Sequence, residues 1–209
     1  MEAIEMSFLF LGNRLCLDFI NTEIVASGQR TSLIQSFEDL SAWLIEAGVA
    51  SQEEIKESTV SWSVDQKDGL VREALALRDH LRRMALQVTT HEAVSDPVIA
   101  AINESLQQRQ GYQVLSRVGT GYTVITHYNE SASGLLTPIA ASAADLLAQS
   151  DLRHLHKCEN PQCILYFYDT SKNHVRRWCS MGACGNRSKA AAHYRKSRSQ
   201  SGGAPSTVL

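Results

Sequence analysis

Hydrophobic residues recur at helical spacing along most of the first 150 residues. In residues 8–24, Leu11, Leu15 and Phe19 form one stripe, which predicts a buried helix. The strongest pattern lies in residues 69–88, where apolar positions step by three and four along the stripe Leu70, Ala74, Leu77, Leu81, Met84 and Val88. The charged residues of this stretch are expected on the opposite, outward face: Arg72, Glu73, Asp79, Arg82 and Arg83.

Helix-start signals of two kinds predict four more helices. A serine followed three residues later by an acidic residue can form a capping box, and a proline in the first turn suits a helix start. The capping boxes begin at Ser36 and Ser51, and the prolines are Pro97, with Asp96 as the expected N-cap, and Pro138. Gly48 is expected to end the first of these helices.

The hydrophobic period changes to that of strands after residue 111. Residues 112–118 and 122–128 are rich in β-branched and aromatic side chains, and the glycines at 119 and 121 suit the turn between them. These features predict one β-hairpin. The expected fold class is therefore α+β, with a mainly α-helical N-terminal domain, one β-hairpin and a small C-terminal module.

The charges of the chain are divided unequally between its two parts. Residues 1–150 hold ten Lys/Arg and nineteen Asp/Glu, whereas residues 151–209 hold ten and three. This division suggests an acidic domain at 1–150 and a basic module at 151–198. Residues 199–209 are rich in Ser, Gly and Pro and are expected to be disordered.

The sequence predicts a cytoplasmic protein with no membrane partner. The first residues lack a basic segment followed by an apolar run, so they do not resemble a secretory signal, and no stretch is long and apolar enough to span a membrane. Thiols stay reduced in the cytosol, where clustered cysteines are more often metal ligands than disulfides.

Four of the five cysteines form two closely spaced pairs, Cys158 with Cys163 and Cys179 with Cys184. Each pair can wrap a turn around an ion, and four thiolates complete the tetrahedral shell of one structural Zn²⁺ without leaving a catalytic position open. Two disulfides, or unrelated buried thiols, are the alternatives. Cys16 lies in an apolar stripe and is interpreted as a core residue. Because the module has few large apolar residues, replacing Cys158 or Cys184 with serine is expected to unfold it and leave the helical domain folded.

Cations surround the two cysteine pairs without any acidic residue between Lys172 and Arg198. Asn186 is the expected N-cap of a basic helix from Arg187 to Arg198, held at its start by zinc. We interpret this surface as nucleic-acid-binding, through Lys172, Arg176, Arg177, Asn186, Arg187, Lys189, Arg195, Lys196 and Arg198. The alternatives are a merely solvated helix, or a role of Arg176 and Arg187 as internal braces of the zinc site.

Polar residues accompany the buried stripe of the first predicted helix. Arg14, Asp18 and Asn21 are spaced to share one face, and Arg78 flanks the stripe of the long helix. Buried polar groups need partners, so a structural network of Asp18 with Arg14 or Arg78 is one interpretation. The other is a small-molecule pocket that these four residues form with Trp43.

The cysteine segment resembles the CGNR zinc-finger family. The resemblance rests on the sequences Cys158-x-Asn-Pro-x-Cys163, Asp169-x-Ser-x-Asn173, Arg176-Arg-Trp-Cys-Ser-Met181 and Cys184-Gly-Asn-Arg-x-Lys189. Residues 14–22 are similar to the opening of the ABATE-type domain that usually precedes this finger. The resemblance implies a bacterial transcription regulator, often described as stress-induced, with a DNA-binding finger and a ligand-sensing helical domain.

The expected function is that of a zinc-containing, DNA-binding transcriptional regulator controlled by a small molecule. A zinc module that binds RNA or protein is the alternative. The chain has no nucleophile motif, phosphate loop or open metal site, so no enzymatic activity is expected. A homodimer is expected because operators are commonly read by symmetric dimers.

Overall fold

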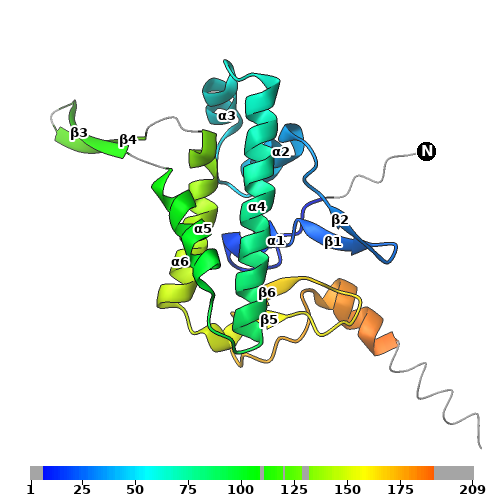
Figure 1. The fold of residues 1–209 in the computed structure, drawn as a ribbon. Coiled ribbons are helices and arrows are strands. Elements are labelled where there is room, and N and C mark those ends of the chain that lie inside the picture. Colours follow the sequence, from blue (N-terminus) through cyan, green and yellow to red (C-terminus); the bar gives the residue numbers. More distant parts are fainter. Residues whose placement is uncertain (1–6, 109–110, 120, 129–131, 191–209) are drawn as a thin grey trace, which may run out of the picture.

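The structure is a computed structural model that describes residues 7–108, 111–119, 121–128 and 132–190. The long helix α4 (Val64–Thr89) runs through the centre of the molecule, and helices α1 (Leu15–Ile20), α2 (Phe37–Glu46) and α5 (Asp96–Gln107) pack against it (Figure 1). The other helical elements are α3 (Gln52–Thr59) and α6 (Thr137–Gln149), the short 3₁₀ helices η1 (Ala132–Leu136) and η2 (Leu152–His154), and the π-helical segment η3 (Met181–Gly185).

The predicted helix-start signals are confirmed for α2 and α3. The hydroxyl groups of Ser36 and Ser51 each accept a hydrogen bond from the backbone N–H three residues on. In turn, the carboxylates of Asp39 and Glu54 accept a hydrogen bond from the N–H of the serine. Gly48 follows α2 with a φ of 68°, as its role as a helix terminator requires. The start of α5 was predicted one residue late, because its N-cap is Ser95 and not Asp96.

The apolar stripe of α4 is buried as predicted, but Arg82, one of the charged residues expected on the outward face, is not exposed. A capping box of Ser63 with Gln66 starts the helix five residues before the predicted stretch. Leu81 and Met84 are fully buried. Arg82, in contrast, turns inward, and its guanidinium contacts three other segments of the chain.

The first predicted helix is much shorter than expected, with six residues in α1. Asn13 has a left-handed φ of 58°, which ends the helix on its N-terminal side. Strands β1 (Glu23–Ala26) and β2 (Gln29–Ser32) then form an antiparallel hairpin. Its turn residues Ser27 and Gly28 both have positive φ values, 51° and 81°, which suit the twist of a two-residue hairpin.

Three two-stranded antiparallel sheets are present in the described residues, and the α+β class is confirmed. The predicted hairpin is β3 (Gly111–Val118) with β4 (Gly121–Tyr128), which projects away from the helices (Figure 1). The sequence analysis missed β1–β2 and the hairpin of β5 (Leu155–Lys157) with β6 (Tyr166–Tyr168). None of the described helices is both long and apolar enough to cross a membrane.

Hairpin β5–β6 carries the first cysteine pair and packs directly on the helical body. It contacts α1 and α4, and Leu155, Tyr166 and Tyr168 are buried in the same core as Trp43. Asn21 of α1 is fully buried and exchanges two hydrogen bonds with the backbone of Tyr166, at 2.8 and 3.0 Å. The cysteine module is therefore anchored in the body by apolar and polar contacts.

Candidate metal centre

The four cysteines come from two turns that face each other. Cys158 follows β5, and Asn160 closes the first turn by accepting hydrogen bonds from the N–H groups of Gln162 and Cys163. Cys179 precedes η3, and Cys184 lies within it. Cys158, Cys179 and Cys184 are buried, and Cys163 is half-buried.

The sulfur atoms have the spacing of a tetrahedral metal site. All four Sγ atoms lie within 4.8 Å of one another. Cys179 Sγ is 3.8 Å from Cys163 Sγ and 3.6 Å from Cys184 Sγ. Zn–S bonds of about 2.3 Å place the sulfurs of a tetrahedron about 3.8 Å apart, so the cluster fits one zinc ion held by four thiolates.

The ionisation of the cluster also favours a bound cation. Hydrogen bonds from the thiols of Cys163 and Cys179 lower the pKa of Cys158 well below its ordinary range. Donating these bonds to Cys158 raises the pKa of Cys163 to about 12 and that of Cys179 further. One thiolate therefore forms readily, but four buried thiolates require a cation to balance their charge.

Two N–H donors stabilise the sulfurs from outside the cluster. The backbone N–H of Cys179 donates to Cys158 Sγ at 3.4 Å, and Arg187 Nη2 donates to Cys184 Sγ at 3.6 Å. Such bonds orient thiolates and disperse their charge. Arg187 thus braces the site, as one interpretation of the sequence proposed.

Family comparisons agree with this geometry. The family model described as CGNR zinc finger matches residues 154–197. The ABATE family model, described as "Putative stress-induced transcription regulator", matches residues 13–150, about two thirds of the chain. The chain belongs to the ABATE family. None of the curated proteins searched matches the sequence.

The basic helix of this ABATE family protein, which contains the metal ligand Cys184, begins earlier than the sequence suggested. Ser180, not Asn186, is the N-cap, and its hydroxyl accepts a bond from the N–H of Ala183. Asn186 has helical dihedral angles and starts the α-helical residues 186–190. Gly185 allows close packing here, because a Cβ atom would lie 2.8 Å from Met181 Sδ and 3.2 Å from Trp178 Cδ1. Zinc therefore holds the interior of this helix, not its first residue.

The arginines before the second cysteine pair are engaged within the protein. Arg176 donates to the carbonyl oxygens of Leu11, Trp178 and Cys179, and its guanidinium lies 4.2 Å from the ring centre of Phe167. These contacts make Arg176 a brace between the module and the N-terminal segment. Arg177 is exposed and pairs with Glu159 at 2.5 Å.

Lys172 and Lys189 are exposed cations of the module that form neither an ion pair with another described residue nor a bond to a cysteine sulfur. They lie in the loop between the cysteine pairs and on the basic helix. The predicted contact residues Arg195, Lys196 and Arg198 lie outside the described residues, as does the predicted disordered tail at 199–209.

A second group of cations, missed in the sequence analysis, lies where the helical body meets the module. Arg30, Arg83 and Lys157 line an open cleft of about 410 Å³ together with Arg82 and Asp79. Glu23 lies 3.0 Å from Arg82 and 3.5 Å from Arg30. Arg83 and Lys157 are exposed. In the sequence, only the position of Lys157 directly before Cys158 could have indicated that this cation lies near the module.

The five residues predicted to line a ligand pocket make contacts within the fold. Trp43 is fully buried and packs on Phe19. Arg78 donates to the hydroxyls of Thr22 and Ser32, at 3.0 and 2.9 Å, and not to Asp18. Arg14 stacks on Tyr168, 4.4 Å from its ring centre, and Asn21 holds β6. None of the five lines any of three cavities that the described residues form, and whether they bind a ligand stays a prediction.

Asp18 forms its bonds with the loop before α1. Its Oδ1 accepts a 2.7 Å bond from the Gly12 N–H. Burial raises the pKa of Asp18 from 3.8 to about 6, although bonds from Gly12 and Leu11 and the charge of Arg176 act in the opposite direction. The folded protein therefore binds more protons at this carboxyl than the unfolded chain does between about pH 4 and pH 6.

Asp18→Asn is expected to change how stability depends on pH. The contribution of Asp18 is present below its ordinary pKa and is lost as the pH rises through about 6, whereas asparagine accepts the same bonds at every pH. Between pH 5 and pH 7.5, the free energy of unfolding of the variant should rise relative to wild type by about 1 kcal/mol. Urea unfolding of both zinc-loaded proteins measures this difference, and a difference independent of pH would contradict it.

Proposed function

We propose that this protein is a DNA-binding transcriptional regulator in the cytoplasm whose zinc module contacts the phosphate backbone. The observation that carries the proposal is the one-sided charge of the module: between Lys172 and Arg198 the chain has eight cations and no acid. Surfaces that serve only for solubility normally mix both signs. The description of the ABATE family as a stress-induced transcription regulator supports the same function.

Within the described residues, we propose four exposed cations as phosphate contacts. Lys172 and Lys189 extend into solvent from the module, and Lys157 with Arg83 adds cations at its junction with the body. Arg176 and Arg187 would act indirectly, by holding the module in shape. The proposed function involves no catalytic step. We further propose that the regulator acts as a symmetric dimer and that a small-molecule effector controls it.

Salt dependence of duplex binding tests the proposed function. With roughly four to six phosphate contacts, log affinity should fall with log salt at a slope of about −4 to −5. Fluorescence anisotropy of a labelled duplex, titrated with zinc-loaded protein at several salt concentrations, measures this slope. Absence of salt-dependent affinity for any duplex would exclude the function, and tighter binding to a folded RNA would favour the alternative.

Replacing Lys172 and Lys189 together with alanine should reduce the magnitude of that slope by about 2, because each phosphate contact contributes about 0.9. Neither lysine forms an ion pair with another described residue, so folding and zinc content should not change. Lys56→Ala, at an exposed site on α3 of the helical body, is the matched control and should leave the slope unchanged. An unchanged slope in the double variant would place the DNA contact elsewhere.

A further inference from the structure

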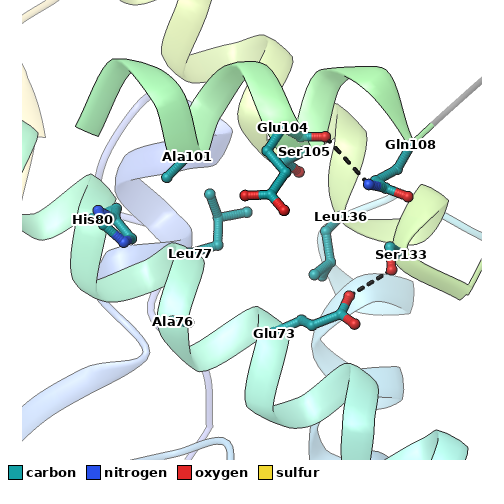
Figure 2. A pocket seen from close by; sticks show the side chains of 10 residues that line it. All are labelled: Glu73, Ala76, Leu77, His80, Ala101, Glu104, Ser105, Gln108, Ser133 and Leu136. Carbon is teal, nitrogen blue, oxygen red and sulfur yellow. Dashed lines mark hydrogen bonds between the residues drawn. The ribbon is translucent and has the colours of Figure 1, made fainter. Parts of the chain in front are cut away.

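A cavity of about 370 Å³ opens between α4, α5 and η1, and none of the four clustered cysteines lines it (Figure 2). Its size suits a small organic molecule. Leu77 and Leu136 form an apolar floor, flanked by Ala76 and Ala101. The polar lining residues are Glu73, His80, Glu104, Ser105, Gln108 and Ser133.

The charges around this cavity are negative. Glu73 from α4 and Glu104 from α5 carry their carboxylates on opposite sides of the apolar floor (Figure 2). Ser133 donates a hydrogen bond to Glu73 Oε2, which holds that carboxylate at the rim. No lysine or arginine is among the residues that line the cavity. A cationic group between the two carboxylates would be attracted to both.

Two buried polar atoms of the cavity wall have no hydrogen-bond partner within the described structure. They are Nδ1 of His80 and Oγ of Ser105. Leaving such atoms unpaired is unfavourable, so the wall of the cavity contains two polar groups whose bonding the described residues do not complete. Both atoms belong to residues that line the same cavity, His80 from α4 and Ser105 from α5.

The geometry favours an organic cation over a metal ion. Among the described residues, the group of His, Cys, Asp and Glu side chains close enough to share an ion is the four-cysteine cluster. Glu73, Glu104 and His80 are too far apart to coordinate one ion together. A molecule with an apolar chain and amine groups can instead span the floor and reach both carboxylates.

We propose that this cavity binds a small aliphatic amine or diamine. The ammonium groups pair with Glu73 and Glu104, and the methylene chain lies on Leu77 and Leu136. A role of this cavity as an effector site rests on the proposed regulatory function, but the binding of an amine to the cavity does not. His80 and Arg82 lie on the same helix, and Arg82 bonds to the zinc module at the Ile164 carbonyl, so α4 links the cavity to the contact between body and module.

Isothermal titration calorimetry of the full-length, zinc-loaded protein tests the site without DNA. The probe is 1,4-diaminobutane, compared with butane-1,4-diol and succinate, which have similar chains but no positive charge. We expect binding of the diamine that weakens with salt, and binding of the diol and succinate at least about 10-fold weaker. Equal binding of all three probes, or no binding of the diamine, would overturn the proposal.

Two variants locate the binding. Glu73→Gln with Glu104→Gln should weaken diamine binding by about 10-fold or more, because both charges are removed while glutamine can still accept the bond from Ser133. Glu57→Gln, an exposed glutamate on α3, should bind like wild type. Circular dichroism and zinc content show that each variant is folded. Unchanged affinity in the double variant would exclude this cavity, whereas loss of DNA binding alone would leave the amine site standing.

Discussion

Replacing Cys184 with serine is expected to release the zinc ion and to destabilise the helical body together with the zinc module. The sequence alone suggested that the body would stay folded. In the structure, however, the hairpin that carries Cys158 contributes Leu155, Tyr166 and Tyr168 to the core of the body. Burying side chains of this kind contributes about 1.5–3 kcal/mol each, so disorder in the module removes several kcal/mol from the body.

Tryptophan fluorescence can follow the body separately from the module. Trp178 lies between the cysteine pairs, whereas the other two tryptophans, Trp43 and Trp62, belong to the core of the body. In a Trp178→Phe background, thermal unfolding of Cys184→Ser should shift the tryptophan transition to a lower temperature by more than about 10 °C. Cys16→Ala, which removes a thiol outside the cluster, should keep its zinc. An unshifted transition of Trp43 and Trp62 in zinc-free Cys184→Ser would show that the body folds independently.

Arg82→Met is expected to destabilise the protein by about 3–5 kcal/mol, the cost of breaking a largely buried ion pair. Arg82 lies 3.0 Å from Glu23 of β1 and donates to the carbonyl oxygens of Ile20 in α1 and Ile164 in the module. Methionine fills a similar volume but leaves the two carbonyl groups without this donor and the Glu23 carboxylate with the exposed Arg30 as its remaining ion-pair partner. Urea unfolding of zinc-loaded protein measures the loss.

Arg83→Met is the matched control for Arg82→Met. Arg83 is the next residue of α4, is exposed, and forms no ion pair with another described residue. Its replacement should change the free energy of unfolding by less than about 0.5 kcal/mol. Similar effects of both substitutions would contradict the assigned role of Arg82 in joining three segments.

Local signals in the sequence predicted much of the helical body. The capping boxes at Ser36 and Ser51 depend on residues three positions apart, and Gly48 acts on its own backbone. The stripe of α4 follows from its period alone. Features of this kind are readable because each interaction is completed within one or two helical turns.

Features that depend on distant residues could not be predicted in the same way. Arg82 looked like a surface residue of α4, because its partner Ile164 is 82 positions away. The residues before and after α1 leave the helical path at Asn13 and at the β1–β2 hairpin, although their apolar spacing suggested a longer helix. At Asn13 the distant partner is β6, because the Asn13 side chain donates a 2.9 Å hydrogen bond to the carbonyl of Tyr168, 155 positions away.

The candidate site was predictable in its ligands but not in the roles of its cations. The spacing of the four cysteines identified the zinc site, and burial raises the pKa of Cys16 to about 11, as expected for a core thiol. In contrast, Arg176 and Lys172 look alike in the sequence. Only their surroundings separate a brace that contacts three carbonyl groups from a cation that extends into solvent.

The zinc content of the full-length protein tests the central claim most directly. Native mass spectrometry of protein purified without added metal should show one zinc ion per chain, with all five cysteines reduced. Cys16→Ala should retain that ion, and Cys184→Ser should lose it. A native protein without zinc, or with the four clustered cysteines joined in disulfides, would contradict the account.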